Sequence, residues 1–128
     1  MSKLLVAIAG ATGYTGEELI RLLLQHPHVQ LSYLAASAKW ESPVSISEVH
    51  PRFARQLDLP VEALSVDRLI NSSDFVFLAL PHGSSAVLMP ALLAAGKSVV
   101  DPIKKNNFSI CFCFITFIRT TLYDSFYS

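Results

Sequence analysis

The chain has 128 residues, 52% of them hydrophobic, and its ten basic side chains balance its ten acidic ones. The length suits one domain with a hydrophobic core. The net charge of zero gives no indication of binding to nucleic acid or to an anionic membrane. Cys111 and Cys113 are too close together to suggest a disulfide framework, and no apolar run reaches the roughly 20 residues that span a bilayer. We expect a cytoplasmic location without a membrane span.

The first segments alternate between strand-like and helix-like patterns. The continuous apolar run at 4–9 predicts a strand covered on both faces. Amphipathic spacing over 17–25, with acidic residues in the first turn, predicts a helix, and 29–36 is a second candidate strand. Residues 37–60 have mixed polarity and three prolines, and we expect an irregular excursion over the sheet edge there.

The alternation continues in the second half of the chain. A short helix is predicted over 66–70, and the run "DFVFLAL" at 74–80 is the strongest strand signal. Residues 84–95 are helix-like, although Pro90 implies a kink or two helical turns that meet there. A last short strand is predicted at 98–100. This order is typical of an α/β fold with a Rossmann-type, doubly wound parallel sheet.

Three glycines at equal spacing separate the first strand from the first helix. Gly10 is free to take backbone angles that a side chain forbids, Gly13 lets a phosphate approach the main chain, and Gly16 lets the helix pack closely. The bare N–H groups of a helix N-terminus attract an anion. The spacing is GxxGxxG rather than GxGxxG, and a ligand-free turn is the alternative. We predict a dinucleotide site made by Gly10, Thr12, Gly13, Tyr14, Thr15 and Gly16.

The end of the second predicted strand bears on which dinucleotide is bound. A cofactor without a 2′-phosphate usually meets a carboxylate about 20 residues past the glycines. Here Ser37 and Lys39 stand in that place, and a hydroxyl and a cation suit a 2′-phosphate. NADP is therefore favoured over NAD. Glu41 lies close enough to keep NAD open, and a solvated surface lysine is the alternative for Lys39.

The loop after the strongest strand is predicted to share the same rim, because ligands lie beyond the carboxyl ends of parallel strands. We assign its residues to the nicotinamide side of the cofactor: Leu80, Pro81, His82 and Gly83. The alternative for His82 is a turn residue that bonds its own backbone.

The other histidines give weaker signals. His26 and His28 flank a proline at a predicted helix end, where we expect surface residues, and His50 is ambiguous. We predict no metal site and no catalytic residue in this chain.

Three segments together resemble one enzyme family: "AGATGYTGEELIRLLLQHP", "SEVHPRF" and "VFLALPHGSSAVLMPALLAAGKSVVD". They are similar to the N-terminal half of the N-acetyl-γ-glutamyl-phosphate reductases, within the aspartate-semialdehyde dehydrogenase superfamily, over about residues 3–101. The resemblance implies NADPH-dependent reduction of an acyl phosphate to a semialdehyde in arginine biosynthesis, in a homo-oligomeric enzyme. Reductases of aminoadipyl or aspartyl phosphate remain alternatives, as does a stand-alone nucleotide-binding or sensor module.

The chemistry that the resemblance implies needs residues outside the matching segments. The family uses a cysteine thiolate in "PGCYP", which takes the acyl group as a thioester, and a histidine as acid–base partner. Neither Cys111 nor Cys113 has that context, since "CFCF" lies in a phenylalanine-rich run where a thiol behaves as a small apolar group. We therefore expect a truncated fold in which this chain alone binds the cofactor without turning over the acyl phosphate.

The composition changes abruptly after residue 102. Residues 103–128 contain no Gly, Pro or Ala, and five phenylalanines crowd residues 108–126. We predict a nucleotide-binding domain over 1–102 and an anomalous hydrophobic tail over 103–128. Read-through of an intron or a frameshift in AT-rich DNA is the favoured origin of the tail, a functional strand or membrane-touching segment the alternative, and an unstable, non-functional product a further one.

Overall fold

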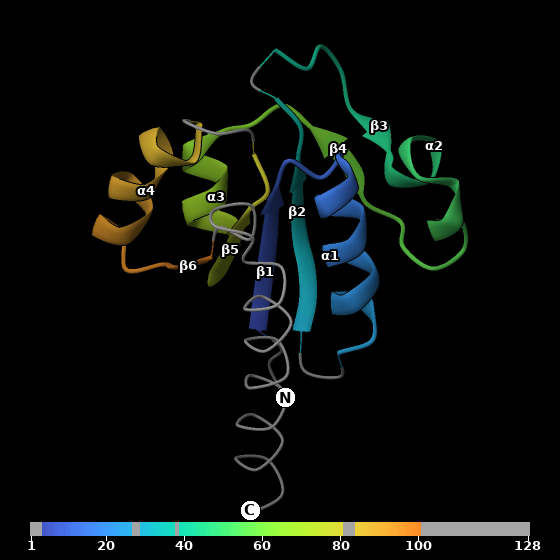
Figure 1. Ribbon diagram of the computed structural model, residues 1–128, viewed down its shortest axis with the longest axis horizontal. Helices are drawn as coiled ribbons and strands as arrows, with labels where there is room; N and C mark the ends of the chain where they lie inside the picture. Colours follow the sequence, from blue (N-terminus) through green and yellow to red (C-terminus); the bar gives the residue numbers. More distant parts are fainter. Residues whose placement is uncertain (1–3, 27–28, 38, 81–83, 101–128) are drawn as a thin grey trace, which may run out of the picture.

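The computed structural model describes residues 4–26, 29–37, 39–80 and 84–100 (Figure 1). Its centre is a six-stranded sheet in the order β3-β4-β2-β1-β5-β6. The strands are β1 (Leu4–Ala9), β2 (Val29–Ala35), β3 (Val44–Ser45), β4 (Pro60–Glu62), β5 (Phe75–Leu78) and β6 (Ser98–Val100). The helices are α1 (Tyr14–Leu24), α2 (Ile46–Val49), α3 (Val66–Ser72) and α4 (Ser84–Ala94), with a 3₁₀ turn η1 (Pro51–Phe53).

Helices cover the two faces of the sheet, as the α/β pattern predicts. Figure 1 shows α1 on one side of the central strands and α3 with α4 on the other. Successive side chains of a strand point to opposite faces, so Val6 and Ile8 pack with α1 while Ala7 and Ala9 pack in the cluster that holds Leu69 of α3 and two leucines of α4. The apolar run of β1 is buried because both of its faces are covered.

The sheet is mixed rather than wholly parallel. β1 pairs in parallel with β2 and β5, and β5 in parallel with β6. β4 extends the parallel part beside β2, through Leu34 with Val61 and Ala35 with Glu62. The edge strand β3 runs antiparallel to β4. An irregular excursion over 37–60 is therefore wrong in part, because this segment forms β3, α2, η1 and the start of β4.

Two helix boundaries also differ from the sequence prediction. α1 begins at Tyr14 rather than at residue 17, with Gly13 as its N-cap residue in extended conformation. The helix therefore starts inside the glycine turn. α4 continues through Pro90 instead of dividing there.

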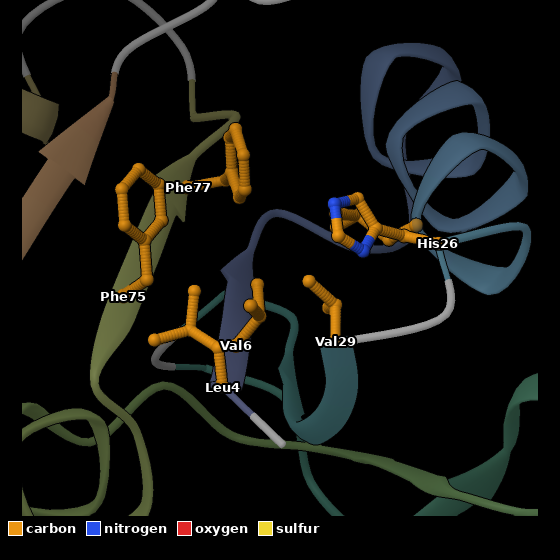
Figure 2. A pocket seen from close by; sticks show the side chains of 7 residues that line it. Leu4, Val6, His26, Val29, Phe75 and Phe77 are labelled. Carbon is orange, nitrogen blue, oxygen red and sulfur yellow. The ribbon is translucent and has the colours of Figure 1, made fainter. Parts of the chain in front are cut away.

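His26 is buried, with 5% of its surface exposed, so its prediction as a surface residue is wrong. Figure 2 shows its ring with side chains from β1, β2 and β5, among them Val6, Val29 and Phe77, which line the same small hollow. The hollow they line has a volume of about 10 Å³, room for one water molecule at most. The end of α1 turns its last residues back over the sheet, which the histidine-proline sequence does not reveal. His28 lies outside the described residues.

In the described part of the chain, every helix is too short or too polar to cross a bilayer.

Candidate functional site

The strand order reverses beside β1. The chain runs outward from β1 to β2 and β4, then crosses to β5 on the other side of β1. In open α/β sheets, ligands bind beyond the carboxyl ends of the strands at such a switch point. The glycine turn follows the carboxyl end of β1 and therefore lies at this point.

The backbone conformation of the turn requires glycine at position 10. Its φ is +91°, in the region that favours glycine. A Cβ at this position would stand 2.1 Å from the carbonyl oxygen of Ala79, which follows β5. The turn thus touches the end of the neighbouring strand through bare backbone, so Gly10 fixes the two carboxyl ends against each other.

Gly16 and Gly13 face different surroundings. A Cβ on Gly16 would lie 2.4 Å from the Gly10 carbonyl oxygen, so a side chain there would clash with the turn and displace α1. A Cβ on Gly13 would meet only that same oxygen, at 3.8 Å, which is ordinary contact. The fold therefore needs glycine at Gly16, whereas at Gly13 the missing side chain leaves the backbone open to the space in front of the turn.

The hydrogen bonds of the turn leave a group of amides for a ligand. The N–H groups of Gly10 and Ala11 both donate to the Ala35 carbonyl of β2, at 2.8 and 2.9 Å, and that of Gly13 donates to Gly10 at 3.3 Å. Within the described residues, Thr12 N–H has no backbone acceptor of this kind. The first turn of α1 adds donors that no helix can satisfy internally, and such a set suits an anion.

A cavity of about 380 Å³ opens in front of the turn. This volume falls within the roughly 300–1,000 Å³ of small-molecule sites. Residues from three segments line it, namely the turn, the end of β2 and the end of β5: Gly10, Thr12, Gly13, Tyr14, Thr15, Ala36, Ser37, Ala79 and Leu80. The structure thus brings residues that are up to 70 positions apart in the chain together in one cavity.

Most of the residues assigned from sequence to the cofactor lie in this cavity, and some do not. Gly16 packs behind the turn and Lys39 is exposed outside the lining set. Pro81, His82 and Gly83 lie outside the described residues. The sequence analysis did not assign Ala36 and Ala79 to the site. Each is a small residue directly after the end of a strand, and this position is the signal that could have identified them.

The described residues contain no cluster of His, Cys, Asp or Glu that could hold a metal ion. The backbone amides and hydroxyl groups of the residues that line the cavity suit the recognition of an anion.

Residues 5–107 match the family model described as the NAD-binding domain of semialdehyde dehydrogenase. This match covers most of the chain and includes the turn and, apart from Leu4, the described sheet. The chain belongs to the NAD-binding-domain family of the semialdehyde dehydrogenases.

Relatives of this NAD-binding domain carry reductase names. The chain is 43% identical over 99 residues to an N-acetyl-gamma-glutamyl-phosphate reductase of Gloeobacter violaceus, which covers 77% of this chain and 28% of the relative. It is 39% identical over 99 residues, with the same coverages, to a [LysW]-L-2-aminoadipate/[LysW]-L-glutamate phosphate reductase of Saccharolobus solfataricus. The chain thus spans just over a quarter of the length of the curated relatives it matches.

Solved structures share the fold of this NAD-binding domain. An aspartate semialdehyde dehydrogenase with NADP from Candida albicans aligns with a TM-score of 0.63 at 22% identity, over 77% of this chain and 29% of that one. An aspartate semialdehyde dehydrogenase II from Vibrio cholerae aligns at 0.58 and 21% identity, over 78% and 31%. At these identities the likeness shows the Rossmann-type α/β fold that the sequence predicted.

Proposed function

We propose that this chain is the NADP-binding part of an acyl-phosphate reductase, with N-acetyl-γ-glutamyl phosphate as the substrate of the whole enzyme and arginine biosynthesis as its pathway. The observation that carries the proposal is the cavity at the switch point, which is lined by Gly13, with its uncrowded backbone, and by Thr12, whose N–H has no backbone acceptor among the described residues. The family and the names of the relatives support the reductase class.

The residues present fit a dinucleotide diphosphate. A Cβ at Gly13 would stand in open space in front of the turn, so the missing side chain makes room for a phosphate oxygen. We assign the diphosphate to Gly10–Gly16, with Thr12 and Thr15 adding hydroxyls, and the nicotinamide side to Leu80, Pro81, His82 and Gly83. Ser37 lines the cavity, and Lys39 lies two residues further along. We assign both to the 2′-phosphate, because a cation favours an anionic group.

The bound dinucleotide would supply the hydride that converts the acyl group to an aldehyde. The residues of this chain bind and orient it: the turn holds the diphosphate, and the two loops beyond β2 and β5 hold its ends. We further propose that 1–102 forms the binding domain and 103–128 a separate tail, and that the 128-residue chain alone shows no turnover.

A second substrate class has an observation in its favour. The relative from Saccharolobus solfataricus, named for aminoadipate and glutamate phosphates, is 39% identical to this chain, which is close to the 43% of the Gloeobacter relative. The binding domain alone therefore does not separate an N-acetyl-γ-glutamyl phosphate from a [LysW]-L-2-aminoadipate phosphate.

Hydrogen exchange of the chain with NADPH and NADH tests the proposal. We expect NADPH to slow amide exchange across Gly10–Gly16, and NADH to do so only at higher concentration. Lys39→Ala should weaken NADPH binding while leaving NADH binding unchanged, since only NADPH carries the 2′-phosphate. A folded chain in which neither nucleotide protects the turn would overturn the proposal.

A further inference from the structure

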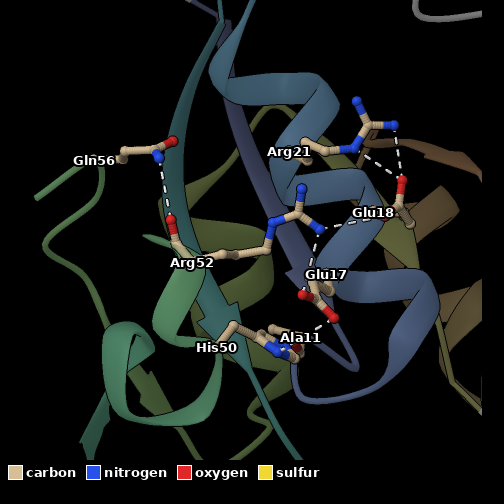
Figure 3. A network of polar contacts seen from close by, with 7 residues as sticks. All are labelled: Ala11, Glu17, Glu18, Arg21, His50, Arg52 and Gln56. Atoms are coloured by element: carbon tan, nitrogen blue, oxygen red, sulfur yellow. Dashed lines mark hydrogen bonds and ion pairs between the residues drawn. The ribbon is translucent and has the colours of Figure 1, made fainter. Parts of the chain in front are cut away.

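His50 lies behind the glycine turn, on the short segment between α2 and η1. Only 8% of its surface is exposed. Its ring packs edge-on against Phe53, with centroids 6.0 Å apart, and its Nε2 lies 2.8 Å from the carbonyl oxygen of Ala11. Figure 3 shows the ring against Ala11 and Glu17 at the start of α1. A side chain from the sheet-edge excursion therefore contacts the backbone of the turn itself.

The direction of this hydrogen bond follows from its acceptor. A carbonyl oxygen can only accept, so Nε2 of His50 carries the hydrogen and donates it to Ala11. The other ring nitrogen, Nδ1, lies 3.6 Å from Oε2 of Glu17. Both a neutral ring with its hydrogen on Nε2 and a doubly protonated ring donate to the Ala11 carbonyl, whereas 3.6 Å is too long for a hydrogen bond from Nδ1 to Glu17.

Both backbone polar groups of Ala11 are thereby hydrogen-bonded, one in each of the two peptide units that Ala11 joins. Its N–H donates to the Ala35 carbonyl of β2 at 2.9 Å, and its C=O accepts from His50. The C=O of one residue and the N–H of the next belong to one planar trans unit and point in opposite directions. Because His50 holds the carbonyl of Ala11, the N–H of Thr12 must point away from His50. Thr12 lines the cavity and His50 does not.

We propose that His50 is a positioning residue of the dinucleotide site: by holding the Ala11 carbonyl, it aims the Thr12 N–H at the cofactor diphosphate. This inference rests on the proposed function, since it names how one donor of that same site is oriented. His50 itself does not contact the ligand. It acts through a single peptide plane.

The charged groups around His50 supply a control. Arg52, two residues on, has its Nη1 3.5 Å from Glu17 and 3.5 Å from Glu18, and 45% of its side chain is exposed. Exposed pairs of this length contribute little to stability. Among the described residues, the polar contacts of Arg52 are with Glu17, Glu18 and Gln56 and none is with the turn backbone, so Arg52→Ala perturbs the same network while leaving the bond from His50 to Ala11 intact (Figure 3).

Two amide substitutions separate positioning from packing. The side-chain amide of glutamine reaches about the place of Nε2, whereas that of asparagine reaches only that of Nδ1. His50→Gln should keep NADPH affinity within about threefold of wild type, and His50→Asn should weaken it on the order of tenfold, the effect of misplacing one hydrogen bond to a charged group. Arg52→Ala should bind NADPH as wild type does.

A fragment ligand supplies the readout that a merely structural role would not move. Adenosine 2′-monophosphate has no diphosphate, so its affinity should be the same in both His50 variants. His50→Asn and His50→Gln with equal NADPH affinities, or an asparagine variant that loses both ligands in parallel, would overturn the role of His50. A wild-type chain that binds no NADPH would instead overturn the proposed function.

Exchange at single amides of the wild-type chain tests the same inference without any variant. We expect NADPH to slow exchange of the Thr12 N–H more than that of Gly10 or Ala11, whose N–H groups already donate to Ala35. Protection confined to the first turn of α1, with Thr12 unchanged, would overturn the proposal.

Discussion

Gly10 and Gly13 stand three residues apart in one turn, yet the fold constrains them in opposite ways. The position of a Cβ on Gly10 is occupied by a neighbouring carbonyl, and its φ is positive. Gly13 has a φ of −84° and an open space around its Cβ position. Any residue can adopt the backbone angles of Gly13, so neither backbone conformation nor packing requires glycine there.

Gly13→Ala should therefore separate binding from folding. We expect the free energy of unfolding to change by no more than about 1 kcal/mol, since the substitution creates no clash and no strained angle. NADPH affinity should fall at least tenfold, because the new methyl group stands where the diphosphate approaches. Urea denaturation and calorimetric titration of one sample measure both quantities.

Gly10→Ala is the matched control in the same turn. It combines a positive φ with a backbone clash, and we expect it to cost roughly 2 kcal/mol or more of folding stability. A Gly13→Ala chain that loses as much stability as Gly10→Ala, or that binds NADPH as wild type does, would contradict the distinction between the two glycines.

The contacts of the two buried histidines, His26 and His50, could not be predicted from local sequence patterns. A glycine trio between a strand and a helix has a local pattern, and it pointed to the turn directly. The partner of His50 is a backbone carbonyl 39 residues away, and no side-chain pattern encodes such a contact. His26 likewise follows a helix end in sequence, but tertiary packing buries it beside residues of β1, β2 and β5.

At the scale of elements, Tyr33 connects β2 to the loop that follows β4. Its hydroxyl donates to the Ala63 carbonyl and accepts from the Ser65 N–H at 3.1 Å. Tyr33→Phe leaves both backbone groups without this partner in a closely packed place. We expect a loss of about 1–3 kcal/mol in the free energy of unfolding at neutral pH, measured by urea denaturation.

The same hydroxyl gives a pH dependence at the alkaline end. Burial raises the pKa of Tyr33 above its usual 10.0, partly offset by the hydrogen bond from Ser65 and by the Arg68 guanidinium. The folded state therefore holds this proton more tightly than the unfolded state does. Its contribution to stability is complete below pH 10 and is lost as the pH rises through the folded-state pKa.

Stability measured against pH in both proteins checks this sign. Wild type should lose more stability than Tyr33→Phe as the pH rises above about 10. Two curves that stay parallel through this range would contradict a buried, hydrogen-bonded hydroxyl.

The elements found from sequence and those missed differ in length and in burial. β1 and β5 are covered on both faces, and their apolar runs identify them without knowledge of the rest. β3 and β4 have two and three residues, too few for an alternating pattern; β4 pairs with β2, and the edge strand β3 pairs with β4. Such short strands depend on long-range pairing, which local composition does not record.

At the scale of the whole molecule, the orientation of α4 is another feature that the sequence alone does not predict. Its sequence is apolar all round, so hydropathy alone does not tell its inner side from its outer side. In the structure Leu88 and Leu92 are buried against the sheet, whereas Val87 and Leu93 are 78% and 57% exposed. Exposed apolar side chains on one helix favour association between molecules.

The double substitution Val87→Lys with Leu93→Lys tests this division of α4. We expect the free energy of unfolding to stay within about 1 kcal/mol of wild type, because neither side chain contributes to the core, while self-association measured by sedimentation falls as charge replaces apolar surface. Leu88→Lys is the control from the inner side and should unfold the chain, since a buried, unpaired charge is not tolerated. Equal destabilisation by the outer pair and by Leu88→Lys would contradict the orientation of α4, and with it the packing of that face of the sheet.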